Sequence, residues 1–485
     1  YLFEMANIRD QCSWIHMQEP VEATEKAKDL LRMSVAKARF LSPLKRVEID
    51  VTQKALVIGG GISGMITSLS LGEQGFEVFL VEREKELGGH ARHIYNTIEG
   101  RDVQNFLKKT IEKVKSHKLI RLYTGADIES ISGFIGNYET EILKHDGAKE
   151  KLRHGVVIVA TGADEYQPTE YLYGKDKRII TQRELEELLE EARSKKPEAR
   201  DESKEKNLAS YLLPHASIVM IQCVGSRDDK HPYCSRICCT QAVKNALRLL
   251  EENPDLSIYI LYKDVRTYGL KENYYHKARE AGIIFVRYDD GTKPELRTTD
   301  GKLIFSVFEP ILHEKIEIGA DLIVLSTGIE PNKDRERLAK MLKVPLNSEG
   351  FFLEAHVKLR PVDFATEGVF IAGMAHNPKT IDEAIGQAEA AAARATTILA
   401  DKKYYAEATI SHVNEDLCAG CGVCSSLCPY EAIEIVSVDS KRKSKVNEAL
   451  CKGCGTCVAG CPSGAMEQFG FTKRQVTAML EALRE

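Results

Sequence analysis

The chain has 485 residues, of which 43% are hydrophobic and 29% are charged, and its formal net charge is −5. This composition is typical of a water-soluble globular protein that is long enough for about three domains. The small net charge gives no reason to expect nucleic acid or an anionic membrane as a partner. No apolar run approaches the roughly 18 residues of a membrane span, and no signal peptide is recognisable, so we expect a cytoplasmic protein without a membrane span.

The N-terminal segment, residues 1–50, is predicted to be a helical arm. It begins at Tyr1 within a helical-looking stretch, which leaves room for further residues upstream. Residues 21–39 have the apolar spacing of an amphipathic helix, which we expect to pack on the following domain or on a partner. A lone cysteine or histidine is more often structural than a ligand, and we interpret Cys12 and His16 in this way.

A βαβ unit follows the arm. Residues 55–58 form an apolar run typical of a buried strand, and the sequence Gly-Gly-Gly-Ile-Ser-Gly occupies residues 59–64. A helix to about Gln74 and a second strand over 77–81 come next. This order is the dinucleotide-binding fingerprint, in which a helix N-terminus offers its N–H groups to a pyrophosphate.

Each glycine of this fingerprint has its own predicted role. Gly59 permits the tight turn, Gly61 lets the chain approach the pyrophosphate, and Gly64 lets helix and strand pack closely. Glu82, at the end of the second strand, is placed to accept hydrogen bonds from ribose hydroxyls. The candidate dinucleotide ligands in this stretch are Gly59, Gly61, Ile62, Ser63, Gly64, Glu82 and Arg83.

Further segments identify the dinucleotide as FAD. Strands are predicted over 155–160 and 321–326, each followed by Thr-Gly, and a strand over 368–372 leads through Gly373 to an alanine-rich helix over 381–399. Together these segments resemble the thioredoxin-reductase-like flavoproteins over residues 54 to about 400. The resemblance implies a split FAD domain with an inserted second domain.

One position departs from the flavoprotein pattern. The family has Gly-Asp where this chain has Gly373-Met374, so the backbone N–H groups near Ile381 are the candidates for holding the ribityl chain. Lys379 is expected either to steady the reduced flavin near N1–C2 or to be merely exposed. The further candidate FAD ligands are Gly89, His90, Ala91, Thr161, Gly162, Gly328, Gly373, Met374, Lys379 and Thr380.

The inserted domain is expected to begin with a charged helix, and a capping box formed by Thr181 and Glu184 marks its start. Residues 194–207 are predicted to be a solvated charged loop. A strand over 217–222 then leads to cysteines instead of a second glycine-rich loop.

Four thiols occupy the place where a second dinucleotide would bind. Cys223 ends the strand, and Cys234, Cys238 and Cys239 stand at the start of the next helix, whose N-terminus we expect to favour thiolates. We interpret this set as a [4Fe–4S] site. The alternative is four buried structural thiols.

The C-terminal region carries eight of the thirteen cysteines in two runs of the form C-x2-C-x2-C-x3-C-P. This is the spacing of a bacterial two-cluster ferredoxin, in which the fourth cysteine of each run binds the other cluster. One [4Fe–4S] cluster is therefore assigned to Cys418, Cys421, Cys424 and Cys461, and the other to Cys451, Cys454, Cys457 and Cys428. Disulfides and zinc are the alternatives, and both fit this repeated spacing poorly.

The whole pattern resembles the family formed by the A subunits of heterodisulfide reductases. The resemblance rests on Gln222-Cys223-Val-Gly-Ser-Arg-Asp, on Tyr233-Cys234-Ser-Arg-Ile-Cys238-Cys239, on the glycine loop and on the double ferredoxin run. It implies that the flavin takes electron pairs from a hydrogenase or formate dehydrogenase module. It also implies that those electrons are divided between ferredoxin and a disulfide-reducing branch formed by the B and C subunits, in a homodimer within a larger complex.

Longer members of that family carry a second two-cluster insertion just before the strand at 155–160. Residues 137–153 contain no cysteine here. Either a separate subunit supplies this relay, or the chain is a shorter homologue in another complex. A non-bifurcating electron carrier and an NAD(P)H-dependent oxidoreductase resembling the small subunit of glutamate synthase are the alternative functions.

The predicted fold class is α/β, a split thioredoxin-reductase-like FAD domain with an inserted Rossmann-like domain, followed by an α+β ferredoxin domain. The expected boundaries are 1–50 for the arm, 51–165 and 328–405 for the FAD domain, 166–327 for the insertion, 408–470 for the ferredoxin domain and 471–485 for a C-terminal helix. The expected cofactors are one FAD and three [4Fe–4S] clusters.

Overall fold

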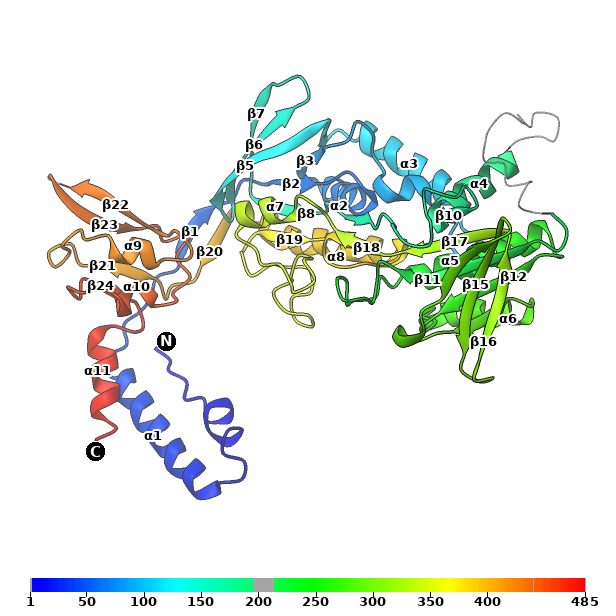
Figure 1. Ribbon diagram of the computed structural model, residues 1–485. Coiled ribbons are helices and arrows are strands. Elements are labelled where there is room, and N and C mark those ends of the chain that lie inside the picture. The colour runs from blue at the N-terminus through cyan, green and yellow to red at the C-terminus, as the bar shows by residue number, and fades with distance from the viewer. Residues whose placement is uncertain (1, 195–212, 439, 485) are drawn as a thin grey trace. The chain divides into compact units, whose positions relative to one another are not determined.

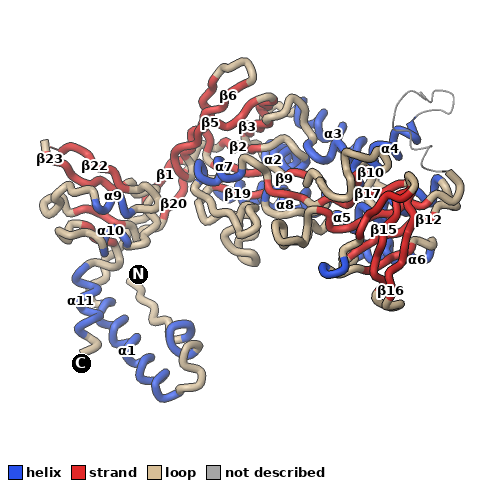
Figure 2. The backbone as a smooth tube through the Cα atoms, in the orientation of Figure 1, coloured by secondary structure: helices blue, strands red, loops and turns tan. Residues whose placement is uncertain are grey.

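The computed structural model describes residues 2–194, 213–438 and 440–484. It falls into two compact units, residues 52–401 and residues 1–51 together with 402–485. Figure 1 labels the elements, and Figure 2 distinguishes helices from strands. The charged loop predicted over 194–207 lies outside the described residues, apart from residue 194, which ends a helix. Among the described residues no helix is both long and apolar enough to cross a membrane.

A parallel five-stranded sheet forms the first half of the larger unit, with the strand order β19-β8-β2-β3-β4. These strands are β2 (Lys54–Ile58), β3 (Glu77–Glu82), β4 (Ile120–Thr124), β8 (Val156–Val159) and β19 (Val369–Ile371). Its helices are α2 (Ile62–Glu73), α3 (Val103–Ser116), α7 (Arg335–Leu342) and α8 (Ile381–Leu399), with short helices η2 (Gly89–His93) and η7 (Gly373–Ala375). Helices α2 and α8 pack on each other, and the buried Thr67 hydroxyl donates to Ala388 O over 3.2 Å.

An antiparallel sheet, β5-β6-β7, follows β4. Its strands are β5 (Ala126–Phe134), β6 (Asn137–Lys144) and β7 (Lys149–His154). Residues 145–148 alone join β6 to β7, so the cysteine-free segment over 137–153 is a closed hairpin. Two short crossing strands, β9 (Ala163–Glu165) and β18 (Ile329–Pro331), pair antiparallel where the chain enters and leaves the inserted half.

The inserted half contains a second parallel sheet, with the order β10-β17-β11-β12-β13. Its strands are β10 (Ile179–Thr181), β11 (Ser217–Val224), β12 (Ser257–Tyr262), β13 (Ile284–Arg287) and β17 (Leu322–Thr327), covered by α4 (Gln182–Ser194), α5 (Cys238–Glu252) and α6 (Glu272–Glu280). An antiparallel sheet of β14 (Glu295–Thr299), β15 (Lys302–Glu309) and β16 (Glu314–Ala320) packs on it, and short helices η5 (Gly269–Lys271) and η6 (Asp290–Thr292) complete this half.

Two parallel sheets within one unit confirm the predicted split α/β fold. The predicted capping box is also present, since the Thr181 N–H donates to Glu184 Oε2 over 2.8 Å and the Glu184 N–H donates to Thr181 Oγ1 over 3.2 Å.

The smaller unit contains the double cysteine run. Its sheets pair β21 (Ser411–Val413) with β24 (Met466–Gln468), β22 (Ile433–Val438) with β23 (Lys441–Val446), and β1 (Val47–Asp50) with β20 (Lys403–Ala406). Its helices are η1 (Arg9–Ser13), α1 (Pro20–Ala38), α9 (Val423–Leu427), α10 (Thr456–Ala459) and α11 (Lys473–Glu481). The expected flavin segment 328–405 overruns its unit, because β20 pairs with β1 here.

Helix α1 packs on the C-terminal helix α11. The side-chain amide of Gln475 donates to Phe40 O over 2.9 Å, and the Lys37 ammonium stands 3.8 Å from the centre of the Phe471 ring. The sequence led us to expect packing on the following domain or a partner. The contacts are instead with α11, because an amphipathic pattern identifies a buried face and not the surface that covers it.

A buried ion pair joins helices α4 and α5. Glu186 is completely buried, and its carboxylate lies 2.6 Å from Lys244 Nζ and accepts the N–H of Tyr95 over 2.8 Å. Burial lowers the pKa of Lys244, and the charge of Glu186 opposes this shift. The pair therefore fastens the chain after η2 to helices α4 and α5.

We predict that Lys244→Met destabilises the chain by about 3–5 kcal/mol, because it leaves the Glu186 carboxylate buried without its partner. Urea unfolding of the apoprotein measures this effect. Adding Glu186→Gln to Lys244→Met should recover most of the loss. Lys151→Met, which breaks an exposed pair with Glu139, is the matched control and should change the midpoint little. Equal effects of the two lysine variants would contradict the prediction.

Candidate cofactor cavity and thiol clusters

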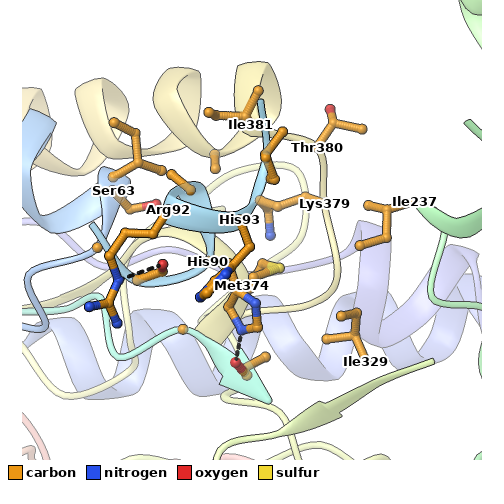
Figure 3. A pocket seen from close by; sticks show the side chains of 18 of the residues that line it. Ser63, His90, Arg92, His93, Ile237, Ile329, Met374, Lys379, Thr380 and Ile381 are labelled. Atoms are coloured by element: carbon orange, nitrogen blue, oxygen red, sulfur yellow. Dashed lines mark hydrogen bonds between the residues drawn. The ribbon is translucent and has the colours of Figure 1, made fainter. Parts of the chain in front are cut away.

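A cavity of about 450 Å³ lies in the larger unit, at the carboxyl ends of β2 and β8 and beside the first turns of α2, α8 and α5. Nearly all predicted FAD ligands line it, namely Gly59, Gly61, Ile62, Ser63, Glu82, Arg83, Gly89, His90, Ala91, Thr161, Gly162, Met374, Lys379 and Thr380. Gly64, Gly328 and Gly373 are not among the lining residues. Figure 3 shows part of the cavity wall.

The three fingerprint glycines have distinct surroundings. Gly59 has φ +107°, and a Cβ there would stand 2.3 Å from Ala160 O, at the end of the neighbouring strand β8. A Cβ on Gly64 would stand 1.8 Å from Gly59 O, so helix α2 can approach the turn only because this residue is glycine. A Cβ on Gly61 would meet nothing within 4 Å. Gly61 therefore borders open space that a ligand can enter, which fits a pyrophosphate at this helix N-terminus.

The acidic residue at the end of β3 holds the glycine turn. Glu82 Oε2 accepts the Gly60 N–H over 2.5 Å, and Oε1 accepts the Glu84 N–H over 2.8 Å. Arg83 pairs with Asp334 over 2.9 Å. The Glu82 carboxylate still borders the cavity, where a ribose can share its lone pairs.

The segment after Gly88 forms another side of the cavity. His90 Nε2 lies 2.6 Å from Ala163 O, the contact drawn in Figure 3, so this histidine ties η2 to the first crossing strand. Arg92 and His93, from the same short helix, also line the cavity. The sequence analysis did not select them, because their spacing carries no motif.

The loop before α8 brings a buried lysine to the cavity. Lys379 Nζ donates to Gly373 O over 3.0 Å and to Asn377 Oδ1 over 2.8 Å. Burial, followed by the nearby charge of Arg236, lowers its pKa to about 7. The alternative of a merely exposed lysine is therefore wrong, since Lys379 is 8% exposed. Figure 3 shows its amine among the labelled side chains of the cavity.

Helix α8 begins with its own capping box. The Thr380 N–H donates to Glu383 Oε2 over 3.0 Å, and the Thr380 side chain accepts the Glu383 N–H in return. Thr380 and Ile381 border the cavity, so the start of α8 lies on the cavity wall. Met374, which stands where the flavoprotein pattern has the ribityl-binding aspartate, borders the same cavity. Gly373, at φ +73°, packs on Ser63, since a Cβ there would stand 2.3 Å from the Ser63 hydroxyl oxygen.

The structure also brings the four thiols of the inserted half together. Burial raises the pKa of Cys238 well above its usual value, and Cys239, Cys223 and Cys234 raise it further because all lie within electrostatic range. Cys238 Sγ donates to Thr327 O over 3.3 Å, and Cys223 adopts a left-handed φ of 61° at the end of β11. A donor set of four thiols fits a [4Fe–4S] cluster.

The helix N-terminus favours a thiolate as expected, since the backbone N–H of Cys238 lowers the pKa of its own thiol, but burial outweighs this contribution. Burial raises the pKa of Cys239 to about 12 and also raises that of Cys223. Desolvation disfavours a thiolate more strongly here than the partial charges of one helix end favour it. Cys223, Cys238 and Cys239 therefore keep their protons until a metal displaces them.

The loop that carries the thiols is pinned by buried hydroxyl groups. The Ser226 hydroxyl donates to Tyr233 O over 2.9 Å, and Ser235 Oγ accepts the Ile329 N–H over 2.8 Å. The ring of Tyr166 fills the space above the turn after β11, because a Cβ on Gly225 would stand 2.1 Å from it. The turn at Gly225 is therefore filled by a side chain, whereas the turn at Gly61 borders open space.

The thiol loop and the cavity share a wall. Ile237 and Thr240 flank the vicinal cysteines at the start of α5, and both line the cavity together with Thr327. Sequence reasoning missed them, although their position beside Cys238 and Cys239 is a signal that could have identified them.

In the smaller unit, Cys428 lies with the second cysteine run. A small pocket is bordered by Cys428, Cys451, Cys454 and Cys457. Burial raises the pKa of Cys457, and the charges of Cys451, Cys454 and Cys428 add to the shift. This is the crossed ligand set that the ferredoxin spacing predicts.

Two of the remaining four cysteines contact Ser444 on β23. Cys424 Sγ lies 3.1 Å from Ser444 Oγ, and Cys418 Sγ accepts the Ser444 N–H over 3.5 Å. Cys461 belongs to the same apolar cluster as Cys424, and Cys421 is exposed. Burial opposes thiolate formation at Cys418, but the N–H groups of Ser444 and Gly420 outweigh it and lower the pKa.

All thirteen cysteines are free thiols, so the structure contains none of the disulfides considered as an alternative. Within the described ranges, no three His, Cys, Asp or Glu side chains stand close enough to bind one metal ion. A [4Fe–4S] cluster asks for a wider arrangement, since each thiolate binds a different iron.

Two family models match the chain. The model described as "4Fe-4S dicluster domain" covers residues 406–467, and the model described as "NAD(P)-binding Rossmann-like domain" covers residues 57–106. Among solved structures, thioredoxin reductase from T. acidophilum is 14% identical with a TM-score of 0.46, covering 72% of this chain and 100% of that one. The reductase from Lactococcus lactis is 16% identical with the same TM-score, covering 72% of this chain and 99% of that one.

Curated relatives cover most of the chain. The second iron–sulfur A subunit of CoB–CoM heterodisulfide reductase from Methanopyrus kandleri is 37% identical, covering 91% of this chain and 79% of that protein. The A subunit of the H2:CoB–CoM heterodisulfide,ferredoxin reductase from Methanothermobacter thermautotrophicus is 35% identical, covering 90% and 77%. A protein from Archaeoglobus profundus that is named as similar to heterodisulfide reductase A subunits is 34% identical, covering 100% and 85%. From this identity over most of its length, the chain belongs to the family of heterodisulfide reductase A subunits.

Proposed function

We propose that this chain holds one FAD and three [4Fe–4S] clusters and divides electron pairs between a ferredoxin branch and a disulfide-reducing branch, in the cytoplasm. When bound, FAD exchanges electrons in pairs with a donor and singly with iron–sulfur clusters. The contribution of the chain is to position these groups and set their potentials. The observation that carries the proposal is the wall shared by the flavin cavity and the thiol loop.

Bonded and packed residues of this shared wall connect the thiol loop with the cavity over a short path. Cys238 donates its thiol hydrogen bond to the carbonyl of Thr327, whose residue lines the cavity. Ile237 and Thr240 reach the same cavity from either side of the vicinal cysteines. A cluster bound by Cys223, Cys234, Cys238 and Cys239 therefore has the cavity as its neighbour.

The FAD contacts follow from the cavity wall. Gly61, Ile62 and Ser63 are assigned to the pyrophosphate, and Glu82 to the ribose. Lys379 and Thr380 are assigned to the flavin edge, where negative charge that develops on the flavin favours the protonated form of Lys379 and is stabilised by it. Met374 contributes no donor side chain, so the N–H groups at the start of α8 are assigned to the ribityl chain.

The partners are proposed from the relatives. Their names describe reductases of a heterodisulfide and ferredoxin that use H2 or formate. We therefore assign this chain to a complex with proteins resembling the B and C subunits, a hydrogenase or formate dehydrogenase module, ferredoxin and a second copy of itself. Because residues 145–148 close the hairpin where longer members carry an insertion, a separate subunit supplies the relay on that side.

We predict that Gly61→Ala leaves the apoprotein as stable as the wild type but lowers FAD affinity at least about tenfold, because the methyl group enters the space assigned to the pyrophosphate. Gly64→Ala should instead destabilise the apoprotein by about 1–3 kcal/mol, since its Cβ would collide with the carbonyl of Gly59. Fluorescence titration with FAD and thermal unfolding measure the two effects. Full FAD binding by Gly61→Ala would contradict the assignment.

Spectroelectrochemistry of the anaerobic holoprotein tests the division of electron pairs. We expect the second electron to enter the flavin at a higher potential than the first, so that the flavin bleaches in a single two-electron step. Two separated one-electron steps in the ordinary order would instead support a non-bifurcating electron carrier.

Titration with NADH separates the remaining alternative. The closed turn at Gly225 leaves no open approach for a second dinucleotide, so NADH should not bleach the flavin. Prompt bleaching would favour the NAD(P)H-dependent oxidoreductase.

A further inference from the structure

The ferredoxin region repeats more than its cysteines. Ser411 precedes Cys418 by the same seven positions by which Ser444 precedes Cys451. The two serines lie on β21 and β23 and are only 2% and 6% exposed. They are therefore equivalent positions of an internal repeat, and both are buried.

Each serine contacts the cysteines of the other half. Ser444 Oγ lies 3.1 Å from Cys424 Sγ, while its N–H donates to Cys418 Sγ over 3.5 Å. Ser411 Oγ lies 3.2 Å from Cys457 Sγ, and its N–H donates to Cys451 Sγ over 3.4 Å. Each cysteine run therefore receives a serine from the other half of the repeat, just as the second run receives Cys428 from the first half.

The glycines between the cysteine ligands also lie against the backbone of the opposite half of the repeat. A Cβ on Gly420 would stand 2.2 Å from Arg442 O, and a Cβ on Gly453 would stand 2.1 Å from Thr409 O. Arg442 and Thr409 each lie two residues before one of the serines. The glycines therefore allow each serine strand to lie against the cysteine loop of the opposite half.

The chemistry of the ligands fixes the direction of these hydrogen bonds. A cysteine that binds iron is a thiolate without a proton, so the serine hydroxyl must donate. Ser444 Oγ also lies 3.7 Å from Cys418 Sγ, but its single proton goes to the closer Cys424. A donor to a sulfur ligand stabilises the reduced, more negative cluster more than the oxidised one and so raises its potential.

We propose that Ser411 and Ser444 are positioning residues that raise the reduction potentials of the two ferredoxin-type clusters, each acting on the cluster held mainly by the other half of the repeat. This rests on the proposed ligand sets. The hydroxyl groups act from a buried site, where water does not replace them.

Paired variants test the proposal on the full-length, anaerobically purified chain. Ser444→Thr and Ser444→Val have almost the same volume, so they differ chiefly in the hydroxyl group, as do Ser411→Thr and Ser411→Val. Redox titration followed by electron paramagnetic resonance should give each Val variant a lower midpoint potential than its Thr partner. The two positions should shift different clusters. Ser437→Val, at an exposed position of β22, is the control and should shift neither cluster.

Iron content distinguishes failure of the proposed function from failure of the proposed role of the serines. If the wild-type chain binds no iron at these cysteines, the proposed function itself fails. If every variant keeps its iron and each Val and Thr pair has equal potentials, only the role of the serines is overturned. A shift of the same cluster from both positions, or loss of a cluster from a Val variant alone, would also overturn that role.

Discussion

The four thiolates of one [4Fe–4S] cluster must each reach a different iron of a single cubane, and this requirement accounts for the arrangement of the ferredoxin region. In the ferredoxin region this requirement brings Cys428 from the first cysteine run to the second. Each serine strand likewise lies against the cysteine loop of the opposite half, and a glycine in that loop makes room for it. We propose the same requirement for the inserted half, where Cys223 at a strand end lies within electrostatic range of the vicinal pair at the start of α5. Cys238 and Cys239 are buried and their pKa values are raised, so metal binding there must displace their protons.

The two Rossmann-like halves show how the same topology serves different ligands. After β2, the turn at Gly61 is open and faces a helix N-terminus, which suits a phosphate. After β11, the equivalent turn at Gly225 is filled by Tyr166 and followed by cysteines. In our proposal, the thiols that take the place of a phosphate loop make the second half an electron carrier beside the cofactor cavity. The chain belongs to an FAD-binding iron–sulfur oxidoreductase family.

Local patterns in the sequence were sufficient wherever chemistry and spacing lie close together. The glycine loop, the capping box of Thr181 and Glu184 and the crossed position of Cys428 are set by residues a few positions apart or by a strict repeat. Properties that depend on contacts between distant parts of the chain could not be predicted in this way. The raised pKa of Cys239 depends on burial by distant strands, and the contact between His90 and Ala163 depends on how a crossing strand is placed. The amphipathic pattern of α1 could not reveal that α11 covers it.

Metal and flavin analysis of the chain purified without oxygen tests the central claim most directly. Three cubanes and one flavin predict about twelve irons and one FAD per chain. Cys238→Ala should retain about eight irons, while Cys12→Ala, which removes a buried thiol outside the three sets, should retain all of them. Zinc in place of iron, cystine among these residues, or an unchanged iron content in Cys238→Ala would contradict the account.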